Sequence, residues 1–287
     1  MDVRNAVSGL AVIVTLAFSH VLAQPVSSTE SRSGAVPIFE ISADDSGKVL
    51  SIDPVVILTG KKFTPVPDAC AESHDLLQFE KKYLYVGARY SLIFGGRAVG
   101  IVRVMGLNGP DWQVNADSSI KLKDLTMALA VAGLPLPKGI SKRRKPTTAQ
   151  VERAKRLAAK VFQEHDAPAS LVTNVSISQI SLVDLHGVPQ LFVAAEIPLA
   201  DGGGIDYSLS FLADLAGGVK SILWFQHSPG EAEAEALYLI DQLDIDEDGI
   251  DELFLRRVFY ENYRYEIYKH NPNGWEKVFA TQILGCE

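Results

Sequence analysis

Alternating apolar and polar residues dominate the chain from Val36 to Val104 and again from about Leu171 to the end. This period of two residues is typical of strands that bury one face of a sheet. The clearest case joins two such runs, 90–94 and 98–104, through Gly95-Gly96. A double glycine supplies the positive φ angles that a two-residue turn requires, so the pattern predicts a β-hairpin.

Two segments between these regions have helical spacing instead. The first covers 122–132, where apolar residues recur every three or four positions and a glycine and a proline follow as stop signals. The second begins near Thr147, which is placed to form a capping box with Gln150, and ends by Pro168. Its apolar face consists of Val151, Ala154, Leu157, Ala158, Val161 and Phe162.

Beyond residue 170 the pattern predicts eight strands without intervening helices, which favours antiparallel pairing. The predicted strands are 171–185, 191–197, 207–212, 221–225, 236–240, 253–260, 263–268 and 275–279. We therefore expect an α+β fold that is mostly β. It comprises a small N-terminal β unit over 36–110, a helical linker region over 111–168 and a C-terminal antiparallel β domain over 169–287.

The N-terminal 23 residues resemble a secretory signal peptide. Arg4 precedes an apolar run over 10–18 that is too short to span a bilayer, and small residues follow at 21–23. A Ser-rich stretch over 24–35 then predicts a flexible leader. We expect an exported protein, periplasmic or secreted, without stable membrane insertion after cleavage; the alternative is an N-terminal membrane anchor.

Export changes the interpretation of the two cysteines, Cys70 and Cys286. An oxidising compartment would allow them to form a disulfide, which would tie the end of the chain to its early part. The alternative is a pair of free thiols, because sequence does not give their separation.

Charge is unevenly distributed over the chain. With 27 basic and 35 acidic residues the formal net charge is −8, so the chain as a whole does not favour nucleic acid as a partner. The segment 138–160 nevertheless holds nine basic residues and only Glu152 as an acid. Such a stripe suits an anionic lipid or polymer, but the absence of interleaved aromatic residues favours a solvated linker and helix face.

The strongest chemical signal is the segment 241–252, which holds seven carboxylates in twelve residues. Like charges this crowded repel one another unless a cation intervenes. Alternating aspartates converge if the backbone curls, and a glycine at the sixth position, Gly249, permits that curl. Hard oxygen ligands favour calcium. The candidate ligands are Asp244, Asp246, Asp248, the carbonyl of Ile250, and Glu252.

Leu255 occupies the twelfth position, where a helix–loop–helix calcium hand needs a bidentate glutamate. The flanking residues also read as strands, which places the ion in a β-hairpin loop. The alternative is a solvated acidic turn, since Asp-Gly by itself is a hairpin signal.

The stretch DIDEDGIDELFL over 244–255 resembles the FG-GAP and VCBS-type repeats of integrin-like propellers and exported bacterial proteins. In that family the acidic loop binds calcium between two strands of a blade. The resemblance implies the same five ligands here, and it covers only the C-terminal part of the chain. The ending FYENYRYEIYKHNPNGWEKVF also looks like that of uncharacterised exported proteins with this repeat.

An internal repeat agrees with this resemblance. Residues 184–193 align with 246–255, but Leu182, His186 and Gln190 stand where the later copy has Asp244, Asp248 and Glu252. We expect the earlier copy to be metal-free. Two repeats are too few to close a propeller, so a pair of packed sheets built from two blade-like repeats is the expectation.

No catalytic motif accompanies these features: the sequence has no H-E-x-x-H, G-x-S-x-G, Walker or C-x-x-C pattern. We expect an exported, calcium-stabilised binding or structural protein, with an extracytoplasmic protein or polysaccharide as partner. The alternative is an exported metal-dependent hydrolase that uses the acidic cluster at 241–252. A catalytic ion would need an open coordination position beside a pocket, whereas a structural ion would be enclosed.

Overall fold

The computed structural model describes most of the chain from residue 34 onward. The described residues are 34–44, 46–67, 74–108, 113–122, 127–134, 136–137, 141–185, 187–199, 204–228 and 235–284. The predicted signal peptide, nearly all of the predicted leader, and both Cys70 and Cys286 lie outside them. Among the residues described, no helix combines the length and apolar character needed to cross a bilayer.

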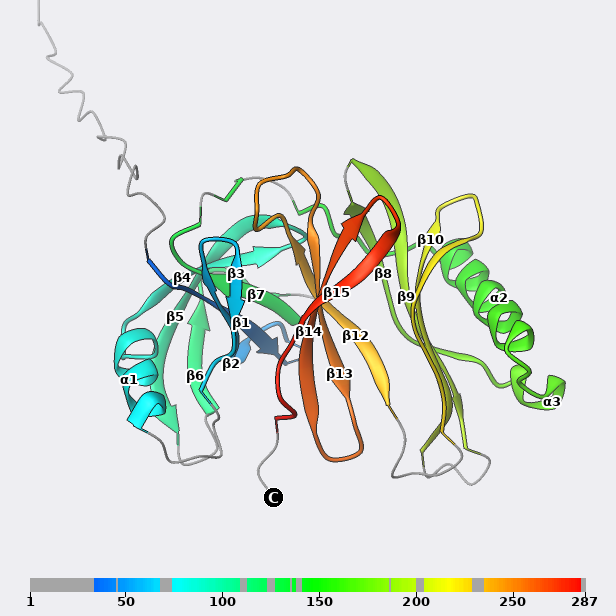
Figure 1. Ribbon diagram of the computed structural model, residues 1–287, viewed down its shortest axis with the longest axis horizontal. Coiled ribbons are helices and arrows are strands. Elements are labelled where there is room, and N and C mark those ends of the chain that lie inside the picture. The colour runs from blue at the N-terminus through cyan, green and yellow to red at the C-terminus, as the bar shows by residue number, and fades with distance from the viewer. Residues whose placement is uncertain are drawn as a thin grey trace, which may run out of the picture. The chain divides into compact units, whose positions relative to one another are not determined.

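Three antiparallel sheets make up the fold, which is therefore mostly β, as the sequence predicts (Figure 1). Sheet A has seven strands in the order β3-β2-β1-β7-β4-β5-β6. Their bounds are β1 Val36–Ala43, β2 Val49–Thr59, β3 Lys62–Thr64, β4 Arg89–Phe94, β5 Arg97–Asn108, β6 Gln113–Ser118 and β7 Met127–Val131. The predicted hairpin is confirmed as β4–β5, with Gly95 and Gly96 at φ +59° and +69°.

Sheets B and C are two successive four-stranded meanders in the C-terminal half of the chain. Sheet B consists of β8 Ser176–Leu185, β9 Val188–Pro198, β10 Ile205–Asp214 and β11 Val219–His227. Sheet C consists of β12 Ala236–Leu243, β13 Glu252–Val258, β14 Tyr263–Asn271 and β15 Gly274–Ala280. Closed barrels and propellers are not formed by the described strands.

The helices are α1 His74–Tyr83, α2 Thr148–Glu164 and α3 Ala169–Val172. The prediction of α2 is confirmed in detail: Thr147 caps it, and the capping box with Gln150 is present. The first residues of the strand predicted over 171–185 instead form α3. The sequence prediction missed α1, although its buried residues Leu76 and Phe79 have helical spacing.

The helix predicted over 122–132 is wrong, because its second half is strand β7. This strand lies in the middle of sheet A, between β1 and β4, and Ala128 to Val131 are all buried. A strand covered on both faces loses the alternation of apolar and polar residues, so its pattern does not distinguish it from a buried helix. The region 111–168 therefore contributes β6 and β7 to sheet A as well as α2.

Four hydrophobic clusters join these elements in a fixed sequence of layers. The first packs α1 on one face of sheet A, through contacts such as Phe79 with Phe39. The second fills the space between the other face of sheet A and sheet C. The third joins the far face of sheet C to sheet B, and the fourth packs α2 on the far face of sheet B. Sheet C is therefore covered on both faces over β12 and β13, whereas its edge strand β15 is largely exposed.

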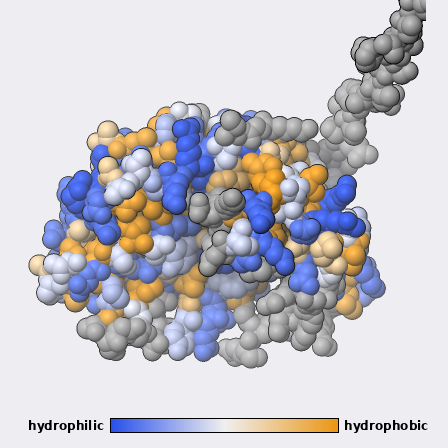
Figure 2. Space-filling view, turned by 180° about the vertical axis from the view of Figure 1, so that it is seen from behind, coloured by the Kyte–Doolittle hydropathy of each residue, from blue (hydrophilic) through white to orange (hydrophobic). Residues whose placement is uncertain are grey.

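On the face of the molecule seen from behind, hydrophobic and hydrophilic residues are not segregated. Figure 2 shows hydrophilic and hydrophobic residues interspersed there, as on most folded proteins.

Charged residues lie buried between sheets A and C. Glu40 of β1 is 0 % exposed, and its Oε1 accepts a hydrogen bond from Arg256 Nη1 of β13 at 3.0 Å. Asp53 lies opposite Glu40 on β2. Burial raises the pKa of Glu40 to about 7, because desolvation outweighs the attraction of Arg256 and the charge of Asp53 adds to it.

This raised pKa makes stability depend on pH. Glu40 holds its proton more tightly in the folded chain, so the free energy of unfolding falls as pH rises from about 4.5 to about 7. Glu40→Gln removes this titration, so relative to the parent the variant gains stability across that window, by at most ~3 kcal/mol. Urea unfolding over this pH range measures the difference, and a difference independent of pH would contradict the assignment.

Candidate metal centre

The acidic segment forms the loop between β12 and β13. The pairing of these two strands ends at Leu243 and Glu252. Both flanks are strands, as predicted. The backbone curls through two left-handed residues, Glu247 at φ +62° and Gly249 at φ +87°. A left-handed curl is therefore present at the glycine, and the side chains of Asp244 and Asp246 come close together in this loop.

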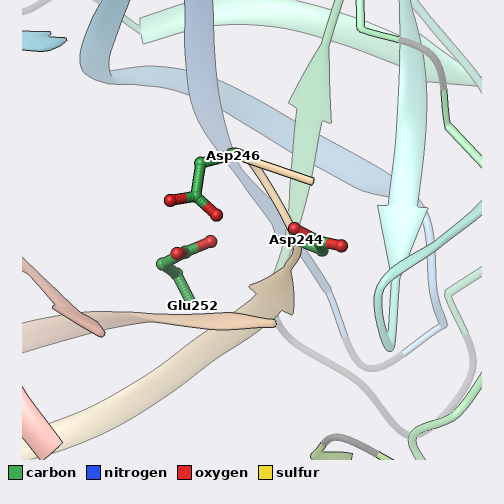
Figure 3. Close-up of side chains that lie close together, drawn as sticks. All are labelled: Asp244, Asp246 and Glu252. Atoms are coloured by element: carbon green, nitrogen blue, oxygen red, sulfur yellow. The ribbon is translucent and has the colours of Figure 1, made fainter. Parts of the chain in front are cut away.

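Three carboxylates of this loop come together: Asp244, Asp246 and Glu252. Each offers one oxygen, and these oxygens all lie within 4.8 Å of one another. Figure 3 shows Asp246 and Glu252 facing each other, with Asp244 beside them. Glu252 is almost fully buried, whereas the two aspartates are partly buried.

Backbone amides of the same loop hold two of these carboxylates in place. Gly249 N donates to Asp244 Oδ2 at 3.0 Å, and Ile245 N donates to Glu252 Oε2 at 3.0 Å. Two other oxygens of the cluster, Asp244 Oδ1 and Asp246 Oδ1, are buried and have no hydrogen-bond partner among the described residues. A buried carboxylate oxygen without a donor is costly, so the loop presents an incompletely satisfied group of acceptors.

The other two predicted ligands are placed differently. Asp248 Oδ1 accepts a hydrogen bond from Ile250 N at 2.8 Å, and its Oδ2 lies 2.8 Å from Lys269 Nζ. Asp248 is exposed and lies outside the group of three. The participation of Asp248 and of the Ile250 carbonyl in a five-ligand set stays a prediction.

Lys269 of β14 supplies a positive charge at this site, which the sequence analysis did not identify. Its ammonium donates to Asp246 Oδ2, to Asp248 Oδ2 and, at 3.2 Å, to Glu252 Oε1. Burial disfavours the ammonium, but these carboxylates outweigh it and raise the pKa of Lys269. Only strand pairing brings Lys269 here, because β14 lies next to β13 in sheet C.

The pKa of Glu252 depends on its burial and on the carboxylates crowded around it. Burial raises the pKa of Glu252 to about 7, and the charge of Asp246 adds to the increase. The hydrogen bonds from Ile245 and Lys269 oppose it without overcoming it. An additional cation would stabilise the ionised form further.

Two of the seven carboxylates serve a different purpose. Asp241, which is 0 % exposed, accepts hydrogen bonds from Gly95 N at 2.9 and 3.0 Å, and Arg143 Nη1 lies 3.9 Å from its Oδ1. Asp251 accepts hydrogen bonds from Lys142 Nζ at 3.1 Å and from Gln242 Nε2 at 2.6 Å. Both acids therefore belong to contacts between elements and not to the cluster.

The basic segment 138–160 is consequently not all solvated. Arg143 is 7 % exposed and donates to Ile240 O at 2.6 Å and to Ser181 Oγ at 3.1 Å. Arg153 of α2 donates to Leu215 O at 2.8 Å. At these positions the positive charges connect elements of the chain, so the stripe is only partly available to a partner.

The earlier copy of the repeat has a different turn. Leu185 of β8 pairs with Val188 of β9, so only residues 186 and 187 separate the strands. The corresponding turn between β12 and β13 spans residues 244–251. The two copies are therefore hairpins with turns of unequal length; His186 lies outside the described residues.

No family model, curated protein or solved structure matches this chain. The functional conclusion therefore depends on the geometry of the site, and the resemblance of 244–255 to FG-GAP and VCBS-type loops stays a prediction.

The role assigned to Asp241 predicts a large loss of stability in Asp241→Ala. This change leaves Arg143 buried without its acidic partner and Gly95 N without an acceptor, so the free energy of unfolding should fall by about 3–5 kcal/mol. Glu261→Ala, at an exposed position between β13 and β14, should cost less than about 0.5 kcal/mol. Urea unfolding compares the two, and equal losses would show that Asp241 is not a structural contact.

Proposed function

We propose that this chain is an exported, calcium-stabilised protein of binding or structural kind. The observation that carries the proposal is the convergence of Asp244, Asp246 and Glu252 within one curled loop. The unpartnered oxygens Asp244 Oδ1 and Asp246 Oδ1 support it, because a cation would give these two oxygens the positive partner that no described donor gives them; Lys269 contacts the other oxygen of Asp246.

Calcium is the ion that the donor set favours. All candidate ligands are oxygens, and neither histidine nor cysteine belongs to the cluster. Calcium accepts six to eight oxygen ligands in flexible geometry, whereas magnesium demands a nearly ideal octahedron. We expect the affinity of an extracellular structural site, with a Kd on the order of 10⁻⁴ to 10⁻³ M.

The ion would act on the hairpin β12–β13, which lies in the central sheet. Its ligands come from the loop that follows β12 and from the first residue of β13. Holding them together restrains the two strands and fixes a loop of like charges. Sheets B and C, as two consecutive four-stranded meanders, are compatible with the blade-like repeats that the FG-GAP resemblance implies.

Three further expectations rest on the N-terminal sequence and on charge. They are export, a periplasmic or secreted location, and an extracytoplasmic protein or polysaccharide as partner. An extracytoplasmic compartment suits a weak calcium site, because calcium there is abundant enough to fill it. Nucleic acid remains disfavoured as a partner by the net charge of −8.

Calcium should therefore raise the melting temperature of the parent chain. At ~10 mM calcium a site of this affinity contributes about 1–3 kcal/mol, which corresponds to a shift of several degrees. Asp246→Asn removes one member of the cluster and should abolish the shift. Thermal melts in calcium and in chelator measure both effects.

Glu247→Gln provides the matched control, because it makes the same change of charge in the same loop but outside the cluster. This variant should retain the calcium-dependent shift of the parent. Equal melting temperatures of the parent in calcium and in chelator would contradict the proposal.

One observation favours the hydrolase as a second candidate function. Asp246 and Glu252 line a pocket of about 370 Å³, so an ion at the cluster would lie beside open space. A catalytic ion needs such an open coordination position. Calcium-dependent turnover of an ester or glycoside, lost in Asp246→Asn while the chain stays folded, would favour this candidate over the binding or structural one.

A further inference from the structure

The pocket beside the acidic cluster lies between the edge of sheet A and sheet C. Its walls come from β2, β3 and their connecting turn on one side, and from the acidic loop, β13, β14 and β15 on the other. Its volume of about 370 Å³ falls within the range of small-molecule sites.

The lining combines an apolar floor with positive charges. The apolar residues are Leu58, Phe63, Ile245, Val278 and Phe279. The rings of Phe63 and Phe279 lie 5.6 Å apart between centroids, so the two sheets meet at an aromatic contact here. Such a floor suits the apolar body of a ligand, since burying it removes apolar surface from water.

Three lysines line the same pocket: Lys61, Lys62 and Lys269. Lys61 and Lys62 are exposed in the turn and at the start of β3, and Lys269 is partly buried. Two carboxylates, Asp246 and Glu252, also line it. The balance of these charges decides which ligand the pocket prefers.

In the structure Lys269 is engaged by the acidic loop, because it contacts Asp246, Asp248 and Glu252. Lys61 lines the same pocket as Asp246 and Glu252. The single ammonium of Lys269 faces three carboxylates and offsets their charge only in part, so an anion that approaches Lys269 would meet uncompensated negative charge. A divalent cation at Asp244, Asp246 and Glu252 would neutralise those acids, release Lys269 and make the potential around Lys61 more positive.

We propose that this pocket binds a small amphiphilic anion, with its apolar body on Phe63 and Phe279 and its anionic group on Lys61 and Lys269. We further propose that a cation in the acidic loop strengthens this binding. The inference rests on the proposed calcium site, and it adds a ligand class and a coupling between the two ligands.

Anilinonaphthalene sulfonate is a suitable probe, because it is an aromatic anion whose fluorescence rises in an apolar pocket. The parent chain should bind it about five- to tenfold more tightly in calcium than in chelator, a coupling of ordinary size. Phenylnaphthylamine, which has the same rings without the sulfonate, should bind equally in both conditions. Fluorescence titration measures both affinities.

Two variants test the lysines. Lys61→Gln should reduce the calcium-dependent gain in sulfonate affinity while leaving the calcium-dependent melting shift in place. Lys269→Gln should weaken sulfonate binding in calcium and tighten calcium itself, because it removes the ammonium that competes for the carboxylates. Lys155→Gln, on the exposed face of α2, is the matched control and should behave as the parent does.

The outcomes separate the two proposals. A calcium-dependent melting shift with unchanged sulfonate affinity would overturn the anion pocket and leave the calcium site standing. Equal melting temperatures in calcium and in chelator would overturn the calcium site, whatever the probe does. A gain in sulfonate affinity that persists in Lys61→Gln and Lys269→Gln would place the probe elsewhere and contradict the assignment of the pocket.

Discussion

The buried contact between Asp241 and Arg143 holds the three sheets in one arrangement. Asp241 belongs to sheet C, accepts hydrogen bonds from Gly95 of the sheet A hairpin, and faces an arginine that donates to Ser181 of sheet B. Burial raises the pKa of Asp241 to about 7 and lowers the pKa of Arg143. Each buried charge is tolerated only because the other lies close by. The ion pair therefore favours this arrangement of the sheets, although desolvation of the two charges opposes it.

The geometry around this contact explains the double glycine of the hairpin. A Cβ at Gly95 would lie 2.3 Å from Arg143 N, and one at Gly96 would lie 2.8 Å from Asp251 Oδ2. Both positions therefore need glycine for two reasons: the positive φ of the turn and the close approach of the neighbouring segment. The hairpin thus carries part of the interface between the sheets.

The same interface divides the acidic segment into two groups with different tasks. Gly95 N donates to Asp241, and Lys142 and Gln242 donate to Asp251, which anchors both ends of the loop. Asp244, Asp246 and Glu252 instead face one another, and Asp246 and Glu252 also face Lys269 and the pocket. A rigid frame therefore holds a crowded group of carboxylates in place, which is the arrangement that a cation site requires.

The sequence alone predicted the glycine hairpin, the capping box of α2, the C-terminal strands and the curl of the acidic loop. Each of these features depends on residues that are close together in the sequence. The sequence did not reveal β7, since a strand buried on both faces has no alternating pattern. It also did not separate Asp241 and Asp251 from the cluster, or place Lys269 beside it, because those contacts join residues far apart in the chain. Strand order and sheet packing alone decide such encounters, and neither is encoded in local periodicity.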